Sequence, residues 1–173
     1  MPLIMLHTTD LRKKAVYSFM AMMEQIHAKS YSHIFTTLLP SSETNYLLDK
    51  WVIEEPHLKY KSDKIVNNYH KLWGKEASVF DQYMARVSSV FLETFLFYSG
   101  FYYPLYLAGQ GRMTTSGEII RKILLDESIH GVFTGMDAQS LRNELSESEK
   151  QQADQEMYKL LEDLYRNEVA YTH

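Results

Sequence analysis

Cysteine is absent from the 173-residue chain. The sequence therefore has no disulfide framework, no thiolate zinc site and no cysteine nucleophile. The apolar start, Met1 to Leu6, is too short for the hydrophobic core of a signal peptide, and no basic segment precedes it. These features favour a protein of the reducing cytoplasm.

Glycine and proline are also scarce, at 7 and 4 residues, whereas tyrosine and phenylalanine are plentiful, at 13 and 8. Long helices joined by short loops explain this balance best. The net charge is −4, and there is neither a basic stripe nor a polybasic cluster. We therefore expect no nucleic-acid partner and no membrane surface as partner.

The stretch 87–109 is apolar enough to raise the question of a membrane span. Glu93 lies within it, and Gly100 and Pro104 interrupt it. An ionised group in hydrocarbon is costly without partners, so a buried bundle helix is the better interpretation. Ser99, Gly100 and Pro104 also predict a kink near its far end.

The pattern of apolar residues and helix breakers predicts one all-α domain spanning residues 1–173. Thr8, Thr9 and Asp10 offer caps for the first long helix. No alternating strand pattern lasts long enough to count. The predicted helices cover 11–39, 43–53, 58–73, 75–107, 114–141 and 149–171.

A short pattern occurs twice, as Glu24-x-x-His27 and as Glu127-x-x-His130. The spacing puts a carboxylate and an imidazole on one face of a helix. A single copy is a weak signal, because it also fits a surface pair on an amphipathic helix. Two copies within apolar helices of an all-α chain instead favour a dimetal site inside a helical bundle.

Glu93 is the only charged residue between Arg86 and Arg112, so we expect it to be a further ligand. The alternative is a carboxyl paired with a core tyrosine or histidine. Carboxylate and imidazole donors without thiolates suit a dinuclear manganese or iron site. Asp126 precedes a ligand candidate, and two roles stay open for it: holding an imidazole N–H beside the metals, or facing solvent.

Tyr31 lies one helical turn after His27 and would therefore sit close to the metals. Phe97 and Phe101 follow Glu93 at helical spacing, and Ile123 lies four residues before Glu127. Such an apolar sleeve would keep water away from a phenoxyl radical on Tyr31. The alternative is a core tyrosine with ordinary core neighbours.

Three segments resemble helices of the ribonucleotide reductase small subunit, in particular the manganese-using bacterial class Ib type. Residues 21–32 (AMMEQIHAKSYS) resemble its metal-and-radical helix, and residues 91–101 (FLETFLFYSGF) its middle-carboxylate helix. Residues 119–132 (IIRKILLDESIHGV) resemble its second Glu-x-x-His helix. The three segments occur in the family order along nearly the whole chain.

The resemblance implies a ferritin-like helical bundle and assigns a role to each candidate. The implied metal ligands are Glu24, His27, Glu93, Glu127 and His130. Tyr31 would be the tyrosyl radical site, Phe97, Phe101 and Ile123 its pocket, and Asp126 the carboxylate that links a ligand histidine to radical transfer. The implied partners are a large catalytic subunit that makes deoxyribonucleotides, a flavodoxin-like activator and a second copy in a homodimer.

Family members begin before Met1, where a helix carries an aspartate ligand and a tryptophan used in radical transfer, and they continue beyond the last residue here. We therefore expect a central fragment, with the first and last family helices missing or shortened and possibly complemented by another chain. Asp10 is not a substitute for the aspartate. Two alternatives stay open: a ferritin-like dimetal oxidase, and a non-catalytic helical fragment that binds metal.

Overall fold

The computed structural model describes residues 1–74 and 76–172, and the described residues form helices with no strand among them. Two short π-helical segments, η1 (Leu47–Trp51) and η2 (Leu92–Leu96), interrupt the α-helical course. The predicted all-α class is confirmed. The α-helices are α1 (Pro2–Leu6), α2 (Leu11–Leu38), α3 (Ser41–Tyr46), α4 (Val52–Glu54), α5 (Pro56–His70), α6 (Val79–Phe91), α7 (Tyr98–Gly109), α8 (Thr114–Arg142) and α9 (Glu147–Thr172).

Polar side chains mark where several helices begin. The Asp10 carboxylate accepts the backbone N–H groups of Arg12 and Lys13 at 2.8 and 3.3 Å, which caps α2 as predicted. The Ser78 hydroxyl likewise accepts the backbone N–H of Asp81 at the start of α6. The start of α8 lacks such a cap, since the residue before it is Met113, which is in the left-handed region at φ 52° and makes no side-chain capping bond.

The helix predicted over 75–107 is not continuous. It begins at Val79, and Lys75 lies outside the described residues. The irregularity lies in η2, upstream of the kink expected near Ser99 and Gly100, and Pro104 is accommodated inside α7. Apolar periodicity does not distinguish a π turn from an α turn, so the sequence could not place this change. Among the described residues, no helix is both long and apolar enough to span a bilayer.

Two further segments depart from expectation. Residues 2–6 form a short helix, α1, which the sequence did not suggest, and its Ile4 is completely buried. The helix predicted over 43–53 is instead the succession of α3, η1 and α4. Both differences concern short segments whose helicity depends on tertiary packing rather than on their own apolar pattern.

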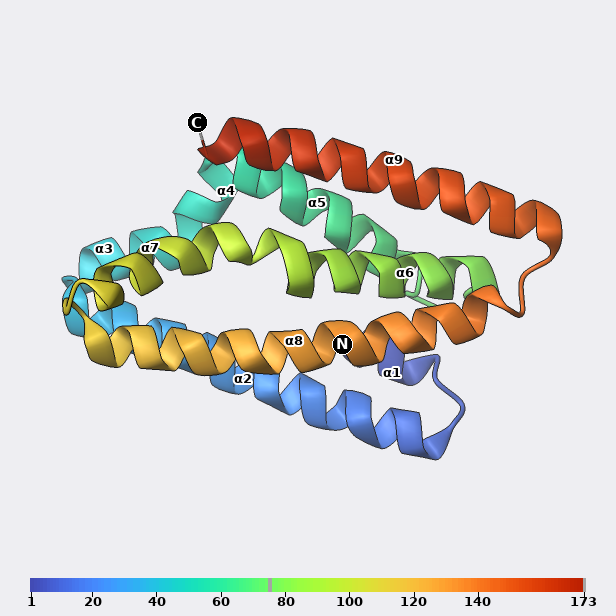
Figure 1. Cartoon of the computed structure of the whole chain (residues 1–173), viewed down its shortest axis with the longest axis horizontal. Coiled ribbons are helices and arrows are strands. Elements are labelled where there is room, and N and C mark those ends of the chain that lie inside the picture. The colour runs from blue at the N-terminus through green and yellow to red at the C-terminus, as the bar shows by residue number, and fades with distance from the viewer. Residues whose placement is uncertain (75, 173) are drawn as a thin grey trace.

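Figure 1 shows the long helices lying roughly along one axis, with α8 running beside α6 and α7, α2 below it and α9 above. The α6 helix packs against α8, and α9 packs against both α5 and α6. A core cluster of Tyr83, Met84, Val87, Ala138 and Ala153 joins α6, α8 and α9. This packing fixes α8 relative to α6 and its continuation η2, which carry residues of the candidate site.

A buried ionic network joins three of these helices on the side of α1. The Asp137 carboxylate of α8 accepts hydrogen bonds from Lys13 Nζ and Tyr17 Oη of α2, at 2.7 and 2.8 Å. It also accepts Arg86 Nε of α6 at 2.5 Å, and Arg86 Nη2 donates to Thr8 Oγ1 at 3.1 Å. Arg86 and Asp137 are almost completely buried, so their charges depend on each other for compensation.

Candidate metal centre

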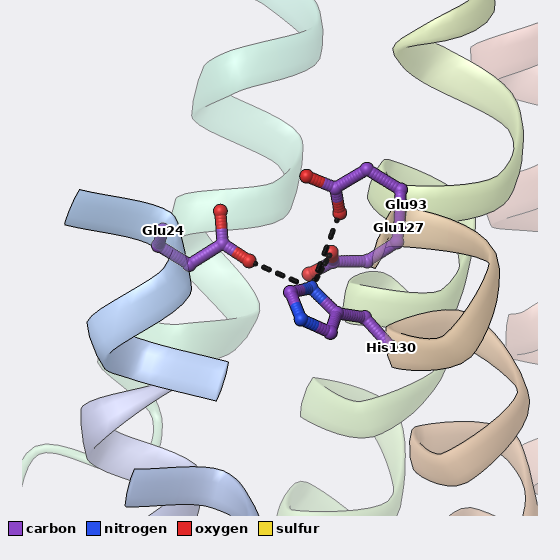
Figure 2. Close-up of side chains that lie close together, drawn as sticks. All are labelled: Glu24, Glu93, Glu127 and His130. Atoms are coloured by element: carbon purple, nitrogen blue, oxygen red, sulfur yellow. Dashed lines mark ion pairs between the residues drawn. The ribbon is translucent and has the colours of Figure 1, made fainter. Parts of the chain in front are cut away.

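Three elements bring the five predicted ligands together. Glu24 and His27 come from α2, Glu93 from η2, and Glu127 and His130 from α8. One donor atom from each of Glu24, Glu93, Glu127 and His130 lies within 4.8 Å of all the others. Figure 2 shows these four side chains pointing toward one another from separate helices. The cluster therefore forms from residues up to about a hundred positions apart in the sequence.

The two histidines face the carboxylates through the same ring atom. His130 Nδ1 lies 3.0 Å from Glu24 Oε1 and 3.4 Å from an oxygen of Glu93 and of Glu127. His27 Nδ1 lies 2.9 Å from Glu127 Oε1, and the two imidazole rings are 5.9 Å apart. Glu127 therefore stands between the two histidines, as a carboxylate shared by two cations would.

Unsatisfied polar atoms provide a test of whether the residues fit a metal site. Among the described residues, six buried side-chain atoms lack a hydrogen-bond partner, and one of them is Thr134 Oγ1. Burying such atoms without partners is costly, so a cluster of them requires an explanation. The other five belong to the five predicted ligands: Glu24 Oε1, His27 Nδ1, Glu93 Oε2, Glu127 Oε2 and His130 Nδ1. Convergent oxygen and nitrogen lone pairs of this kind fit divalent cations.

The charges of the cluster change the proton affinity of its histidines. Burial alone would lower the pKa of His130, but the facing carboxylates, with Glu127 first, raise it to about 11. Burial likewise opposes protonation of His27, yet Glu127, Glu24 and Asp126 raise its pKa to about 10. A cation must displace these protons, so metal binding releases protons and weakens as the pH falls.

The carboxylates differ from one another in their proton affinity. Burial raises the pKa of Glu93 to about 8, and the negative charges of Glu127 and Glu24 act in the same direction. Burial acts the same way on Glu127, but contacts with His130 and His27 lower its pKa to about 2. Glu127 therefore stays ionised, as does Glu24, whose pKa is lowered by contacts with His130 and His27 in spite of burial.

Asp126 contacts the far side of a candidate ligand. Its Oδ2 lies 3.1 Å from His27 Nε2, while His27 Nδ1 faces Glu127. A carboxylate on the distal nitrogen orients an imidazole and raises its basicity toward a metal. Of the two roles left open by the sequence, this geometry favours the one in which Asp126 holds the imidazole.

Tyr31 lies in an apolar cluster beside the site. It packs, partly buried, with Phe97 and with the buried Phe101 and Ile123, in a cluster completed by Ile34 and Ile120. Burial raises the pKa of the Tyr31 phenol, and the nearby charge of Glu127 adds to the rise. The structure therefore brings Tyr31 together with the three residues of the expected sleeve, and its surroundings keep the phenol protonated.

The sequence interpretation missed the close approach between α8 and η2. A Cβ atom built on Gly131 would lie 2.1 Å from Thr94 Cγ2. Gly131 directly follows His130, and Thr94 directly follows Glu93, so this contact sets the separation of two candidate ligands. The sequence did contain one sign of this close approach: a glycine inside a predicted helix, next to a candidate ligand.

We expect Gly131→Ala to lower the free energy of unfolding by about 1–3 kcal/mol, because the added methyl group overpacks the contact with Thr94. Adding Thr94→Ser, which removes the clashing methyl group and keeps the hydroxyl, should recover most of the loss. Chemical denaturation of the single and double variants measures both effects.

Gly100→Ala is the matched control, since Gly100 is also helical and a Cβ there would have no atom within 4 Å. That variant should be neutral or slightly stabilising. A Gly131→Ala protein as stable as the Gly100→Ala protein would contradict the proposed packing constraint.

Fold and site together define a class of protein, an all-α bundle with a buried cluster of carboxylates and histidines able to hold metal. The model of the family "Ribonucleotide reductase, small chain" matches residues 1–173, and the chain belongs to that family.

Similar proteins agree with this assignment. The chain is 47% identical over 174 residues to the ribonucleoside-diphosphate reductase subunit beta of Bacillus subtilis, covering 99% of this chain and 52% of that protein. It is 34% identical to the ribonucleoside-diphosphate reductase 2 subunit beta of Escherichia coli, with 99% and 51% covered. The chain thus spans about half the length of the curated relatives that it matches.

A solved structure has the same fold. The crystal structure of Streptococcus sanguinis dimanganese(II)-NrdF matches with a TM-score of 0.86 and 38% identity, over 99% of this chain and 57% of that chain. The predicted resemblance and the ferritin-like helical fold are confirmed. Neither alternative, the dimetal oxidase or the non-catalytic fragment, gains support from these comparisons.

Proposed function

We propose that this chain supplies the metal-binding and radical-generating core of a ribonucleoside-diphosphate reductase small subunit. The observation that carries the proposal is the convergence of five unpartnered buried donor atoms from α2, η2 and α8 beside a tyrosine in an apolar cluster. Membership of the small-chain family supports it.

In this proposal Glu24, His27, Glu93, Glu127 and His130 bind two metal ions. Glu127 lies between the histidines and would be available to both ions, and Asp126 would orient His27 through its distal nitrogen. The oxygen and nitrogen donors suit manganese or iron. Since the related Streptococcus sanguinis protein is a dimanganese(II) form, manganese is the metal we propose first.

Tyr31 is the residue that we propose carries the radical. When bound and oxidised, a manganese or iron pair supplies the one-electron oxidising power for this step. The phenol would pass one electron to that pair and its proton to a basic group of the site, and Phe97, Phe101 and Ile123 would exclude water from the resulting tyrosyl radical. Glu127 adds negative charge near the ring, which favours loss of an electron over loss of the proton alone.

The partners follow from the same role. The radical would pass to a large catalytic subunit, which reduces ribonucleoside diphosphates for deoxyribonucleotide synthesis. A flavodoxin-like activator would deliver the oxidant to the manganese form. A second copy would complete a homodimer.

We expect Tyr31→Phe to abolish the tyrosyl radical signal while metal binding persists, because only the phenol oxygen is lost. Electron paramagnetic resonance measures the signal in protein loaded with manganese or iron, oxidised, and supplied with the segments that complete a small subunit. Tyr102→Phe is the matched control, because Tyr102 is 69% exposed on α7. A radical that survives in Tyr31→Phe, or never forms in the unmodified protein, would refute the proposal.

A further inference from the structure

The two oxygens of Glu93 have different surroundings. Oε1 accepts a hydrogen bond from the Ser89 hydroxyl at 3.2 Å. Oε2 lies 3.4 Å from His130 Nδ1 and is one of the unpartnered buried atoms of the cluster. The Ser89 bond therefore occupies one oxygen and leaves the other directed into the candidate metal centre.

The Ser89 hydroxyl departs from the usual behaviour of serine and threonine in this chain. Helical hydroxyl groups commonly donate to the carbonyl four residues earlier. Ser30, Thr94 and Ser128 do so here, at 2.7, 2.7 and 2.8 Å. Ser89 instead donates forward to the Glu93 side chain. The Ser89 hydroxyl therefore bonds to a candidate ligand and not to a backbone carbonyl of its own helix.

The surroundings of Ser89 hold this arrangement in place. Ser89 is completely buried near the end of α6, one turn before Glu93 on η2. Tyr69 of α5 contacts the serine, and the thioether of Met1, whose Sδ lies 4.0 Å from the Ser89 hydroxyl, is a weaker acceptor than the Glu93 carboxylate at 3.2 Å. Water is therefore excluded from the Ser89 hydroxyl, and in a low-dielectric setting a hydrogen bond to a carboxylate strengthens.

We propose that Ser89 is a positioning residue for the metal centre: by holding Glu93 Oε1, it directs Glu93 Oε2 toward the metal on the His130 side. The inference rests on the proposed function, because it assigns the ligand mode of one carboxylate in that site. Without the serine hydroxyl, the Glu93 carboxylate is free to rotate and to offer either oxygen. Hydrogen-bond partners of ligands commonly contribute 10–100-fold to metal affinity.

The test is a titration of the full chain with Mn²⁺, using a competing chelator to measure affinity and electron paramagnetic resonance to follow the bound ions. We expect Ser89→Ala to weaken binding of one of the two ions by about tenfold and to change the spectrum of the bound pair. Ser88→Ala is the matched control, because Ser88 is equally buried but its hydroxyl accepts from Asn68 Nδ2 at 2.7 Å. That variant should bind Mn²⁺ as the unmodified chain does.

A second pair of variants separates the hydroxyl from packing. Ser89→Thr and Ser89→Val have nearly the same volume, and only threonine keeps the hydroxyl. The inference requires the threonine variant to bind more tightly than the valine variant, and equal affinities would overturn it. Two Mn²⁺ bound by the unmodified chain, with no effect of Ser89→Ala, would overturn the role of Ser89 but not the metal site. An unmodified chain that binds no Mn²⁺ would overturn both.

Discussion

Glu127→Gln is expected to weaken Mn²⁺ binding by more than about 100-fold, because Glu127 is the ligand we propose the two ions share, and losing a ligand exceeds the 10–100-fold cost of losing a partner of a ligand. Glu127 is 2% exposed and faces both histidines, at 2.9 Å from His27 and 3.4 Å from His130. Glutamine keeps the size of the side chain but removes the charge. One amide oxygen cannot bridge two cations as a carboxylate does.

Equilibrium dialysis with metal analysis gives the stoichiometry, which should fall from two ions per chain to less than one. Thermal unfolding gives a second readout, since a ligand that binds only the folded state raises the melting temperature. Mn²⁺ should raise the melting temperature of the unmodified protein but not that of Glu127→Gln. Glu118→Gln is the control, because Glu118 lies exposed on the same helix, α8. Equal metal content in the two variants would exclude Glu127 as a shared ligand.

The five candidate ligands could be predicted from the sequence, because the spacing of residues along a helix determines which side chains lie on the same face. Residues three apart share a face, so each Glu-x-x-His pair was expected on one face of its helix, and the structure brings the two pairs close together. The lone charge of Glu93 in an apolar stretch supplied the fifth residue. The contact of Asp126 with His27 was one of two possibilities, since sequence spacing does not reveal which way a carboxylate turns between two helices.

Features that depend on the distance between helices were not accessible. The π-helical segment η2 shifts the residues after it, and periodicity does not report such a change. The contact of Gly131 with Thr94 depends on how closely α8 approaches η2. The sequence also does not reveal whether the buried Ser89 hydroxyl donates to a backbone carbonyl of its own helix or to the Glu93 side chain. A pattern of residue types does not encode any of these three features.

The buried network around Asp137 was also invisible in the sequence, because its partners lie 124, 120 and 51 residues away. In the sequence alone, its charged residues cannot be distinguished from ordinary surface charges on amphipathic helices. Removing one partner of a buried ion pair leaves the other charge uncompensated. The network therefore makes the docking of α2, α6 and α8 depend on one carboxylate.

We expect Asp137→Asn to lower the free energy of unfolding by about 3–5 kcal/mol, because the buried Arg86 loses its counter-charge. Asp154→Asn is the matched control: Asp154 pairs with Arg142 on the surface, where the two side chains are 40% and 35% exposed. Exposed pairs contribute about 0–1 kcal/mol, so the control should change little. Urea denaturation measures both, and equal losses would show that the buried network has no special role.

The same substitution should change how stability depends on pH. Burial would raise the pKa of Asp137, but Lys13 and Arg86 outweigh it and lower the pKa below the ordinary value. The folded state then binds fewer protons than the unfolded state, so the carboxylate stabilises the protein fully above the unfolded pKa of about 3.9. This contribution is lost as the pH falls through the lower folded pKa. The stability difference between the unmodified protein and Asp137→Asn should therefore be constant near neutral pH and shrink below about pH 4. A difference that stays the same down to the acid transition would mean that Asp137 acts through packing and not through its charge.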